Sequence, residues 1–389
     1  NPSWTEISCK TVKYNITHGF VWDSDGFDMN YLFHPFSGAL SYTAARSRGL
    51  SFWKSIVYPF AGSLMWEIAM ETERPSSNDL INTTASGIVM GEISFRTSSL
   101  MLNGATTGGK RMWREAAAGI LSPMHGLNRL ISGKSWRVNP DPPAPDYTIS
   151  LSAGMLGLFE DRRLYQKQPH GFLKYHMTYG NPYTAVHGEP FDYFTAHFGL
   201  GFTLHNTIFD IYGSGLLVGK RIRLFDCDKS LVGIFKNYNY INTAIYRTGS
   251  ASVGTGLLTN IPLSPRVSLK SFAMSSIILM GGVDSPYTQS LNRDYNLGPG
   301  IGGKTETSIT LSDIGKLYAS YDPSWVHVVS GAKGIEFVSF GRAGLQTMVN
   351  HTVGWAVEYL HYYHSGSYIS YPAVRRNNVA FLSYVTVTF

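Results

Sequence analysis

The sequence is poor in charged residues and in long apolar runs, and each shortage excludes a class of protein. Charged side chains make up 15% of the 389 residues, whereas soluble domains carry roughly a quarter, so a soluble β-sandwich is disfavoured. No run approaches the roughly 20 apolar residues that a membrane helix requires, so any membrane spanning must be done by strands. The formal net charge of +6 comes from scattered basic residues, which argues against nucleic-acid binding.

Cysteine is also scarce, with Cys9 and Cys227 as the two examples. In an oxidising periplasm they either form a disulfide or remain buried thiols, and the sequence leaves both open. Their spacing does not resemble a metal site, so we predict no metal and no cofactor. Asn1 is not a start methionine and no apolar signal stretch follows it, so we expect a processed product of an exported precursor.

Glycine and aromatic residues are abundant, at 40 glycines and 14% aromatics. The last segment, residues 377–389, shows what they build. Phe381, Val385 and Phe389 fall on one face of a strand, and Leu382 and Tyr384 fall on the other. The alternation and the aromatic end resemble the C-terminal signature of bacterial outer-membrane barrels.

Similar alternating segments recur through the last two thirds of the chain and predict about twelve strands. They lie near residues 148–155, 173–179, 193–204, 208–224, 230–240, 251–263, 267–282, 296–310, 315–322, 333–345, 351–362 and 378–389. Short and long connections fall mostly on opposite sides, with an exception at His205-Asn-Thr207. An even number of antiparallel strands and this asymmetry are typical of single-chain outer-membrane barrels. The predicted fold is therefore an all-β transmembrane barrel.

The first third reads differently and predicts a mainly helical domain. Residues 13–22 suit a strand, and Asp23–Asp28 suits a turn held by aspartates rather than a calcium loop, because the ligand spacing is absent. Helical patterns follow at 41–46, 53–73 with a break near Pro59, 86–101, and 111–132 with an interruption at Pro123. Capping residues at 76–79 predict a helix start. The proline-rich stretch 139–145 separates a domain of residues 1–143 from a barrel of residues 144–389.

Several motifs in this first third resemble a known family. They are His34-Pro-Phe-Ser-Gly38, Trp66-Glu67, Glu73-Arg-Pro-Ser-Ser-Asn-Asp79 and Gly91-Glu92. The string is similar to that of an uncharacterised bacterial family known only as a domain of unknown function. The resemblance implies an exported outer-membrane protein and attaches no activity to it.

The charged residues of the helices do not suit a lipid-facing surface, so we predict that the helical domain plugs the lumen of the barrel. Its arginines and glutamates would meet inward-facing wall residues, including Asp210. The predicted lumen polar network consists of His34, Arg46, Glu67, Glu71, Asn78, Asp79, Glu92, Arg96, Arg111, Glu115, Lys174, His176, His197 and Glu358. Structural ion pairing is expected of these residues in preference to catalysis.

Residues Gly298–Thr305 match the letters of a phosphate-binding loop, G-x-x-x-x-G-K-[ST]. That chemistry needs a helix to open at the lysine. Instead, Thr305, Thr307 and Ile309 alternate with polar residues, so we predict a strand and no nucleotide site.

These observations predict an integral protein of the bacterial outer membrane with a plugged lumen. Its predicted role is non-catalytic, either in solute or lipid passage or as a subunit of an envelope assembly. The alternative is a barrel-embedded hydrolase of lipid or peptide that uses His34, His176 or His197 with a serine. No G-x-S-x-G or H-E-x-x-H motif singles out such a pair, so no catalytic residue is predicted.

Two further expectations follow from this prediction. A third alternative for the fold, a soluble periplasmic β-protein, predicts extraction without detergent. The expected partners of the membrane protein are outer-membrane lipid and lipopolysaccharide, and other envelope proteins remain an open alternative.

Overall fold

The computed structural model divides the chain into two compact units, Asn1–Pro145 and Asp146–Phe389. It describes residues 6–138, 145–160, 163–165, 168–183, 188–202, 207–224, 227–288, 293–312 and 314–389. The predicted connector at 139–144, the loop residues His205 and Asn206, and the side chain of Cys227 lie outside these residues, whereas Cys9 is an exposed free thiol.

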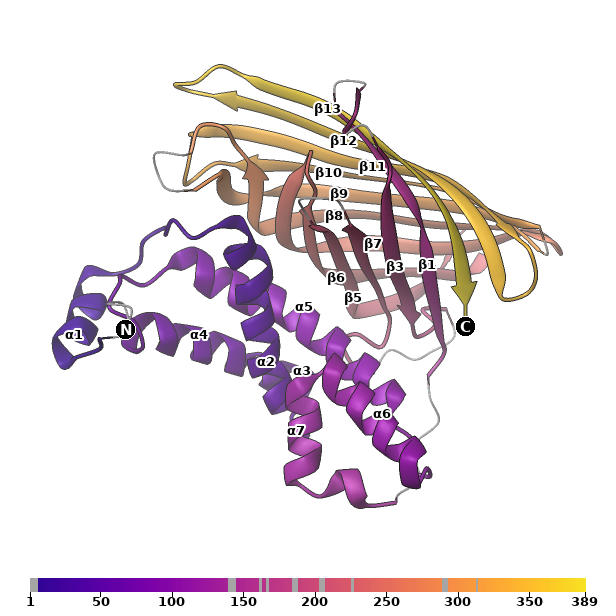
Figure 1. Cartoon of the computed structure of the whole chain (residues 1–389), viewed down its shortest axis with the longest axis horizontal. Coiled ribbons are helices and arrows are strands. Elements are labelled where there is room, and N and C mark those ends of the chain that lie inside the picture. Colours follow the sequence, from indigo (N-terminus) through magenta and orange to yellow (C-terminus); the bar gives the residue numbers. More distant parts are fainter. Residues whose placement is uncertain are drawn as a thin grey trace. The chain divides into compact units, whose positions relative to one another are not determined.

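The first unit is helical throughout (Figure 1). Its elements are α1 (Cys9–His18), the π-helix η2 (Met29–Phe33), α2 (His34–Arg46), α3 (Phe52–Ser55), α4 (Val57–Ala69), α5 (Ser77–Met101), α6 (Gly108–Leu121), α7 (Pro123–Ile131) and the 3₁₀ helix η3 (Lys134–Trp136). No described helix has both the length and the mean hydropathy needed to cross a bilayer.

Local sequence signals explain where several of these helices begin. Ser76 caps α5, because its Oγ accepts a hydrogen bond from the Asp79 N–H at 3.1 Å, as the sequence predicted. Pro123 opens α7 at its first position, where proline lacks no needed N–H, and this confirms the predicted interruption.

One prediction in this unit was wrong, and another was confirmed. Residues 9–18 form α1 rather than a strand, because Ser8 and Thr11 make a reciprocal capping box and Gly19 ends the helix at a φ of 67°. The predicted break near Pro59 is confirmed, because α3 ends at Ser55 and α4 begins at Val57, which places Pro59 in the first turn of α4, where the missing N–H is tolerated.

Helices α2 and α5 pack at a contact that only glycine permits. A Cβ on Gly38 would lie 1.9 Å from the Thr83 carbonyl oxygen, and a Cβ on Gly87 would lie 2.7 Å from the Gly38 Cα. This close approach brings the polar residues of the two helices within hydrogen-bonding reach of each other.

The second unit is a closed antiparallel barrel. Its strands are β1 (Tyr147–Glu160), β3 (His170–Tyr179), β4 (Phe194–Phe202), β5 (Thr207–Leu224), β6 (Cys227–Asn242), β7 (Arg247–Ser264), β8 (Val267–Asp284), β9 (Tyr295–Leu311), β10 (Gly315–His327), β11 (Gly334–Met348), β12 (Val353–Tyr368) and β13 (Val374–Thr388), with the two-residue β2 (Arg163–Leu164) against β1. Neighbours in sequence pair throughout, and β13 pairs with β1 from Ser150↔Thr388 to Phe159↔Val379. Twelve full strands therefore close the barrel, as predicted.

The strand faces alternate between an apolar exterior and a buried interior. On β13, Phe381 and Val385 are exposed, whereas Leu382 and Tyr384 are buried. Exposed Leu151, Leu173, Ile277, Trp325 and Trp355 continue the outer face on other strands. An apolar outer surface on a closed barrel is what lipid contact requires. The 298–305 segment lies inside β9, so the phosphate-loop geometry is excluded.

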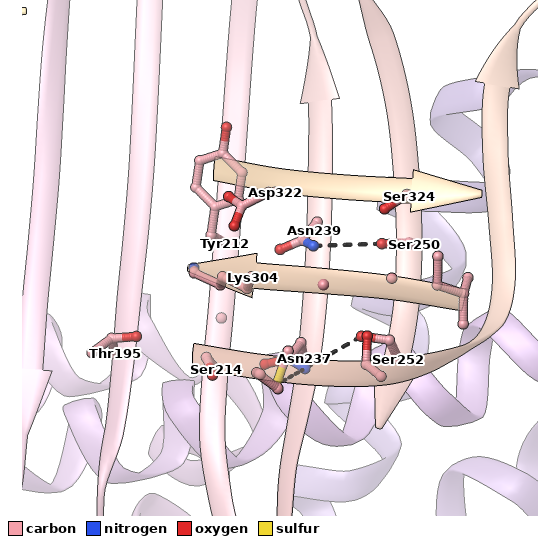
Figure 2. Close-up of a pocket in the computed structure, with 16 residues that line it drawn as sticks. Thr195, Tyr212, Ser214, Asn237, Asn239, Ser250, Ser252, Lys304, Asp322 and Ser324 are labelled. Carbon is pink, nitrogen blue, oxygen red and sulfur yellow. Dashed lines mark hydrogen bonds between the residues drawn. The ribbon is translucent and has the colours of Figure 1, made fainter. Parts of the chain in front are cut away.

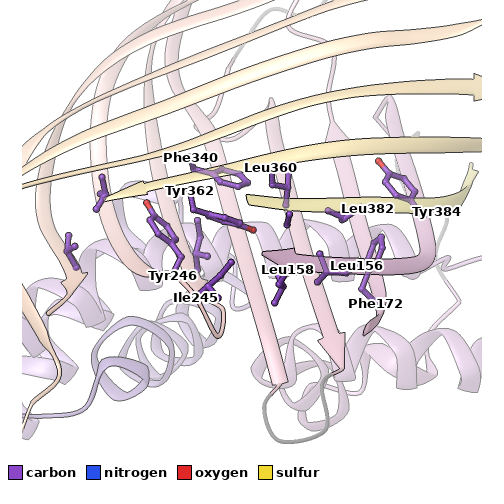
Figure 3. Packing of buried hydrophobic residues seen from close by; sticks show 14 of the residues in the cluster. Leu156, Leu158, Phe172, Ile245, Tyr246, Phe340, Leu360, Tyr362, Leu382 and Tyr384 are labelled. Atoms are coloured by element: carbon purple, nitrogen blue, oxygen red, sulfur yellow. The ribbon is translucent and has the colours of Figure 1, made fainter. Parts of the chain in front are cut away.

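The interior holds a cluster of buried apolar side chains (Figure 3). Phe340, Leu360, Tyr362 and Leu382 belong to it, and so does Ile245 from the connection between β6 and β7. Asn378 on β13 donates a hydrogen bond to the Ile245 carbonyl at 2.9 Å, which ties this connection to the wall. Side chains of the strands and of this connection therefore fill part of the lumen.

Candidate functional site

The polar residues singled out by sequence fall into separate clusters in the two units. In the helical unit, one cluster is formed by Asp23, Asp25, Asn30, His34, Asn78 and Asp79, and we call it the Asp79 cluster. In the barrel, charged side chains of opposite sign pair along the inner face of the wall. Both clusters consist of groups that are costly to bury unless they are paired.

The Asp79 cluster is assembled from three chain segments. Asp23 and Asp25 lie in the loop before η2, where the Asp25 N–H donates to Asp23 Oδ1 at 3.2 Å. This bond confirms the predicted aspartate-held turn. His34 begins α2, and Asp79 lies in the first turn of α5. The Val21–Ser76 backbone bridge holds the loop beside the start of α5.

Three oxygens of the cluster lie around a single amide nitrogen. The Asn78 Nδ2 donates to Asp23 Oδ1 at 2.7 Å, to Asn30 Oδ1 at 2.8 Å and to Asp79 Oδ1 at 3.0 Å. His34 Nε2 is 3.4 Å from Asp79 Oδ1 and 3.6 Å from Asp25 Oδ2. The potential ligand atoms of Asp25, His34 and Asp79 all lie within 4.8 Å of one another.

Burial and negative charge together perturb the carboxyl groups. Burial, a hydrogen bond with Asp23 and the charges of Asp23, Glu67 and Asp25 raise the pKa of Asp79 to about 11. Burial also opposes ionisation of Asp23, but hydrogen bonds from Asp79, Asn78 and Ser76 outweigh it and lower the pKa of Asp23. Asp23 and Asp79 therefore share one proton, as closely spaced carboxyl pairs do.

Glu67 and Glu71 of the helical unit form a second acidic pair. Glu67 is buried and accepts a hydrogen bond from the Ser76 N–H at 2.7 Å. Burial, more than the charges of Glu71 and Asp23, raises the pKa of Glu67 to about 8. Burial is also the main cause of the raised pKa of Glu71. Both glutamates were predicted as network residues, and the structure places them side by side.

The other charged residues of the helical unit pair with one another. Glu92 accepts from Arg46 Nε at 3.0 Å, from Arg96 Nε at 2.7 Å and from Tyr42 Oη at 2.7 Å. Glu115 accepts from both Arg129 Nε and Arg129 Nη2. Such satisfied groups hold helices together and leave no free acid or base for chemistry.

Arg111 also has a structural role. Its guanidinium donates to the carbonyls of Ser135, Lys134 and Arg137, which fixes the turn after α7 beside α6.

The barrel pairs its own inward-facing charges. Lys174 Nζ donates to both Glu358 oxygens at 3.1 and 3.2 Å, and Arg342 Nε lies 3.4 Å from Glu358 Oε1. Tyr318 and Tyr384 donate to Glu358 Oε2. The sequence predicted instead that Lys174 and Glu358 would meet the arginines and glutamates of the helices. The wall satisfies these charges itself, so a plug is not needed to neutralise them.

Two of the candidate hydrolase histidines, His34 and His197, lie beside carboxylates. His197 Nε2 lies 2.7 Å from Asp210 Oδ2, and the His176 ring lies 6.4 Å from the His197 ring. Within the described part of the chain, no serine hydroxyl is hydrogen-bonded to His34, His176 or His197. The Ser98 hydroxyl does lie 3.0 Å from His125 Nδ1, but both residues are buried.

Four aromatic rings form a chain of contacts across the lumen. Tyr212 on β5 stacks on Phe340 of β11 with centroids 6.1 Å apart, and these strands are six places apart around the closed sheet. Phe340 stacks on Tyr362 at 5.2 Å, and Tyr362 contacts Tyr246 at 5.0 Å. We call these four residues the aromatic bridge. It joins opposite walls of the barrel.

A polar pocket lies beside the bridge (Figure 2). Its cavity volume is about 40 Å³, and Tyr212 contributes to both features. Small polar side chains line it, among them Ser250, Ser252 and Ser324. Lys304 and Asp322 add charged groups to the lining. Lys304 also pairs with Glu306 at 2.8 Å. A cavity of this size holds about one water molecule.

The sequence did not identify the bridge or half of the Asp79 cluster. Tyr212, Phe340 and Tyr362 fall on inward faces that alternation reveals, but their meeting depends on strands far apart in the chain. Asp23 and Asp25 were assigned to a turn only. Their proximity to His34 in the sequence was the one available signal.

A closed, even-numbered antiparallel barrel with an apolar exterior defines an integral outer-membrane β-barrel protein. Residues 19–124 of the chain, in the helical unit, match the family model described as a domain of unknown function, DUF3943. This match lies in the part of the chain where the sequence motifs were found.

Solved structures with similar folds are bacterial outer-membrane proteins. The NanC porin has 8% sequence identity and a TM-score of 0.34, and the match covers 61% of this chain and 98% of the porin. An outer-membrane channel from Pseudomonas putida F1 has 9% identity and a TM-score of 0.33, with 65% and 100% coverage. A search of curated proteins found no match.

Proposed function

We propose that the protein is a non-catalytic outer-membrane channel for a small polar solute or ion, closed at rest by the aromatic bridge. The observation that carries this proposal is the stacking of Tyr212 on Phe340 between opposite walls. Rings that meet across a lumen close it to solutes, and apolar constrictions also resist wetting.

The polar lining beside the bridge supports passage over a purely structural role. The pocket is lined by glycine backbone and by serine and asparagine side chains, together with Lys304 and Asp322. A barrel that served only as an anchor would gain stability from apolar packing at these positions. A hydrophilic section next to an aromatic closure is the arrangement expected of a gated pore.

Single-channel recording in planar bilayers tests this proposal. The wild-type protein should show rare, brief openings. The double variant Phe340→Ala with Tyr362→Ala removes two rings of the bridge and should give sustained conductance at least about tenfold higher on average, because the closure is lost. Phe381→Ala is the matched control, since this ring is exposed on the outer face, and it should behave like the wild type.

Two results would contradict the channel. A steady, large conductance in the wild type would show that the bridge does not close the lumen. A double variant that inserts normally and stays silent would show that the barrel has no path to open.

A second candidate, contact with membrane lipid or an envelope partner, is favoured by the surface of α6, α7 and η3. Trp113, Ile120 and Trp136 are 71%, 77% and 76% exposed. Residues 102–138 hold six basic side chains and one acidic one, Glu115, which is bound to Arg129. Exposed tryptophan and isoleucine beside basic residues are typical of helices that lie on anionic membranes.

We propose that this surface, defined by Met112, Trp113, Ile120, Ile131 and Trp136, binds anionic lipid. Only eight residues separate Val138 from Tyr147, the first residue of β1. Since each residue spans at most about 3.6 Å, the connection keeps this surface within reach of the membrane that the barrel spans.

A further inference from the structure

The structure points to a divalent-cation site, which we propose is formed by Asp25, His34 and Asp79 with the side-chain oxygens of Asp23 and Asn30. The ion is of the manganese, iron or zinc class. This proposal concerns the helical unit and does not depend on the channel proposed above.

The donor geometry is the first observation. Asp25 Oδ2, His34 Nε2 and Asp79 Oδ1 converge within 4.8 Å, and Asp23 Oδ1 and Asn30 Oδ1 reach the same amide nitrogen as Asp79 Oδ1. Carboxylate and carboxamide oxygens with one imidazole nitrogen suit divalent first-row metals better than calcium or copper(I).

The second observation is an unpartnered ring nitrogen at the centre of the cluster. His34 Nε2 is buried and has no hydrogen-bond partner among the described residues, although two carboxylates lie within 3.6 Å of it. A positive species among these acceptors would satisfy the carboxylates and the imidazole together.

The third observation is an unsatisfied amide directly beside the cluster. Asn82 is completely buried, and neither its Oδ1 nor its Nδ2 has a hydrogen-bond partner in the described part of the chain. It lies one turn after Asn78 on the same face of α5, and helical side chains lean towards the N-terminal end of their helix. Asn82 therefore follows Asn78 on one face of α5, and water held by a bound ion would supply the partner that its amide lacks.

The cluster has an edge that faces solvent. The Asp25 and His34 side chains are 49% and 21% exposed, whereas that of Asp79 is 6% exposed. A solvent-facing edge for entry and a buried carboxylate for retention are what a metal site requires.

Manganese binding to the full-length, chelator-treated protein in detergent tests the proposal. Loss of the free Mn²⁺ signal in electron paramagnetic resonance should show one ion per chain, and zinc should displace it. Pulsed measurements should detect nitrogen coupling from one imidazole. Asp79→Asn and His34→Ala should each weaken binding at least about tenfold, and His34→Ala should abolish the nitrogen coupling.

Two controls keep the test decisive. His18→Ala removes an exposed histidine of the same unit and should leave affinity and coupling unchanged. Asp25→Asn changes a half-exposed side chain, so it should weaken binding without affecting folding. It therefore tests the site even if the buried substitution Asp79→Asn prevents folding. Absence of stoichiometric Mn²⁺ binding in the wild type, or full binding by folded Asp25→Asn and Asp79→Asn, would overturn the proposal.

Discussion

At the scale of single residues, the helical unit contrasts two kinds of buried charge. Glu92 is surrounded by two arginines and a tyrosine that satisfy it. Asp79 is surrounded mainly by other carboxyl groups. The first arrangement stabilises the native fold, whereas the second is costly unless a proton or a cation is bound. Substitutions of the two residues should therefore act in opposite directions.

Glu92→Gln should destabilise the helical unit by about 3–5 kcal/mol, because it leaves Arg46 and Arg96 buried without a counter-charge. Thermal unfolding followed by far-ultraviolet circular dichroism measures the loss. Glu73→Gln is the control, since Glu73 is exposed, and it should change stability by less than about 0.5 kcal/mol. Equal stability of Glu92→Gln and the wild type would refute the ion-pair assignment.

Stability of the metal-free protein should fall as the pH rises from 5 to 8. The pKa of Glu67 is raised to about 8, so the folded state holds a proton that the unfolded state has released. Stability from this group is complete below its ordinary pKa near 4.5 and is lost as the pH passes about 8. Melting temperatures measured in chelator should show the decline.

Asp79→Asn should leave that decline unchanged, because Asp79, whose pKa is raised to about 11, is already uncharged between pH 5 and 8 and does not oppose the ionisation of Glu67. It should also leave the melting temperature of the metal-free protein at neutral pH equal to or above that of the wild type. A strongly destabilised Asp79→Asn variant would instead assign Asp79 a purely structural role.

At the scale of elements, the contact between α2 and α5 positions the Asp79 cluster. Gly38→Ala should destabilise the helical unit by about 1–3 kcal/mol, because the new methyl group would meet the Thr83 carbonyl. Gly62→Ala in α4 is the same substitution at a position with room for it, because the added Cβ would lie 3.6 Å from Ser41 Oγ. It should be neutral or stabilising by up to about 1 kcal/mol. Thermal unfolding of both variants distinguishes packing from helix propensity.

The α6–α7–η3 surface makes a second prediction at this scale. The double variant Trp113→Ser with Ile120→Ser should weaken attachment of the helical unit to anionic vesicles, since both side chains are exposed. The measurement is quenching of tryptophan fluorescence by brominated lipid in proteoliposomes that contain the full chain. Trp325→Ser on the barrel exterior is the matched control. Unchanged quenching of the helical tryptophans would exclude lipid as the partner.

At the scale of the whole molecule, sequence patterns predicted the barrel better than its interior. Two-residue alternation depends on local geometry, so all twelve strands were located from sequence, and β13 was identified by its exposed Phe381 and Val385. The helix α1 was missed, because its capping box lies in Ser8 and Thr11 rather than in apolar periodicity. The predicted plug followed from the charges of the helices, which pair within the helical unit, and it stays a prediction.

The contacts that the sequence did not predict join segments that lie far apart in the chain. Tyr212 and Phe340 meet only because the sheet closes and places β5 opposite β11. His34 and Asp79 were both singled out, but nothing in their spacing shows that they meet Asp25. Residue types revealed which groups carry chemistry, and the packing of α2 on α5 decided which of them lie together.

Closure of the barrel by β1 and β13 is the central claim, and cross-linking at this seam tests it most directly. Ala153 pairs with Val385, so Ala153→Cys with Val385→Cys, in a chain whose Cys9 and Cys227 are replaced by serine, should form an intramolecular disulfide on mild oxidation. Ala153→Cys with Phe381→Cys, four residues out of register, should not. Efficient cross-linking of the first pair alone is the predicted result, and failure of that pair in folded protein would contradict a closed barrel.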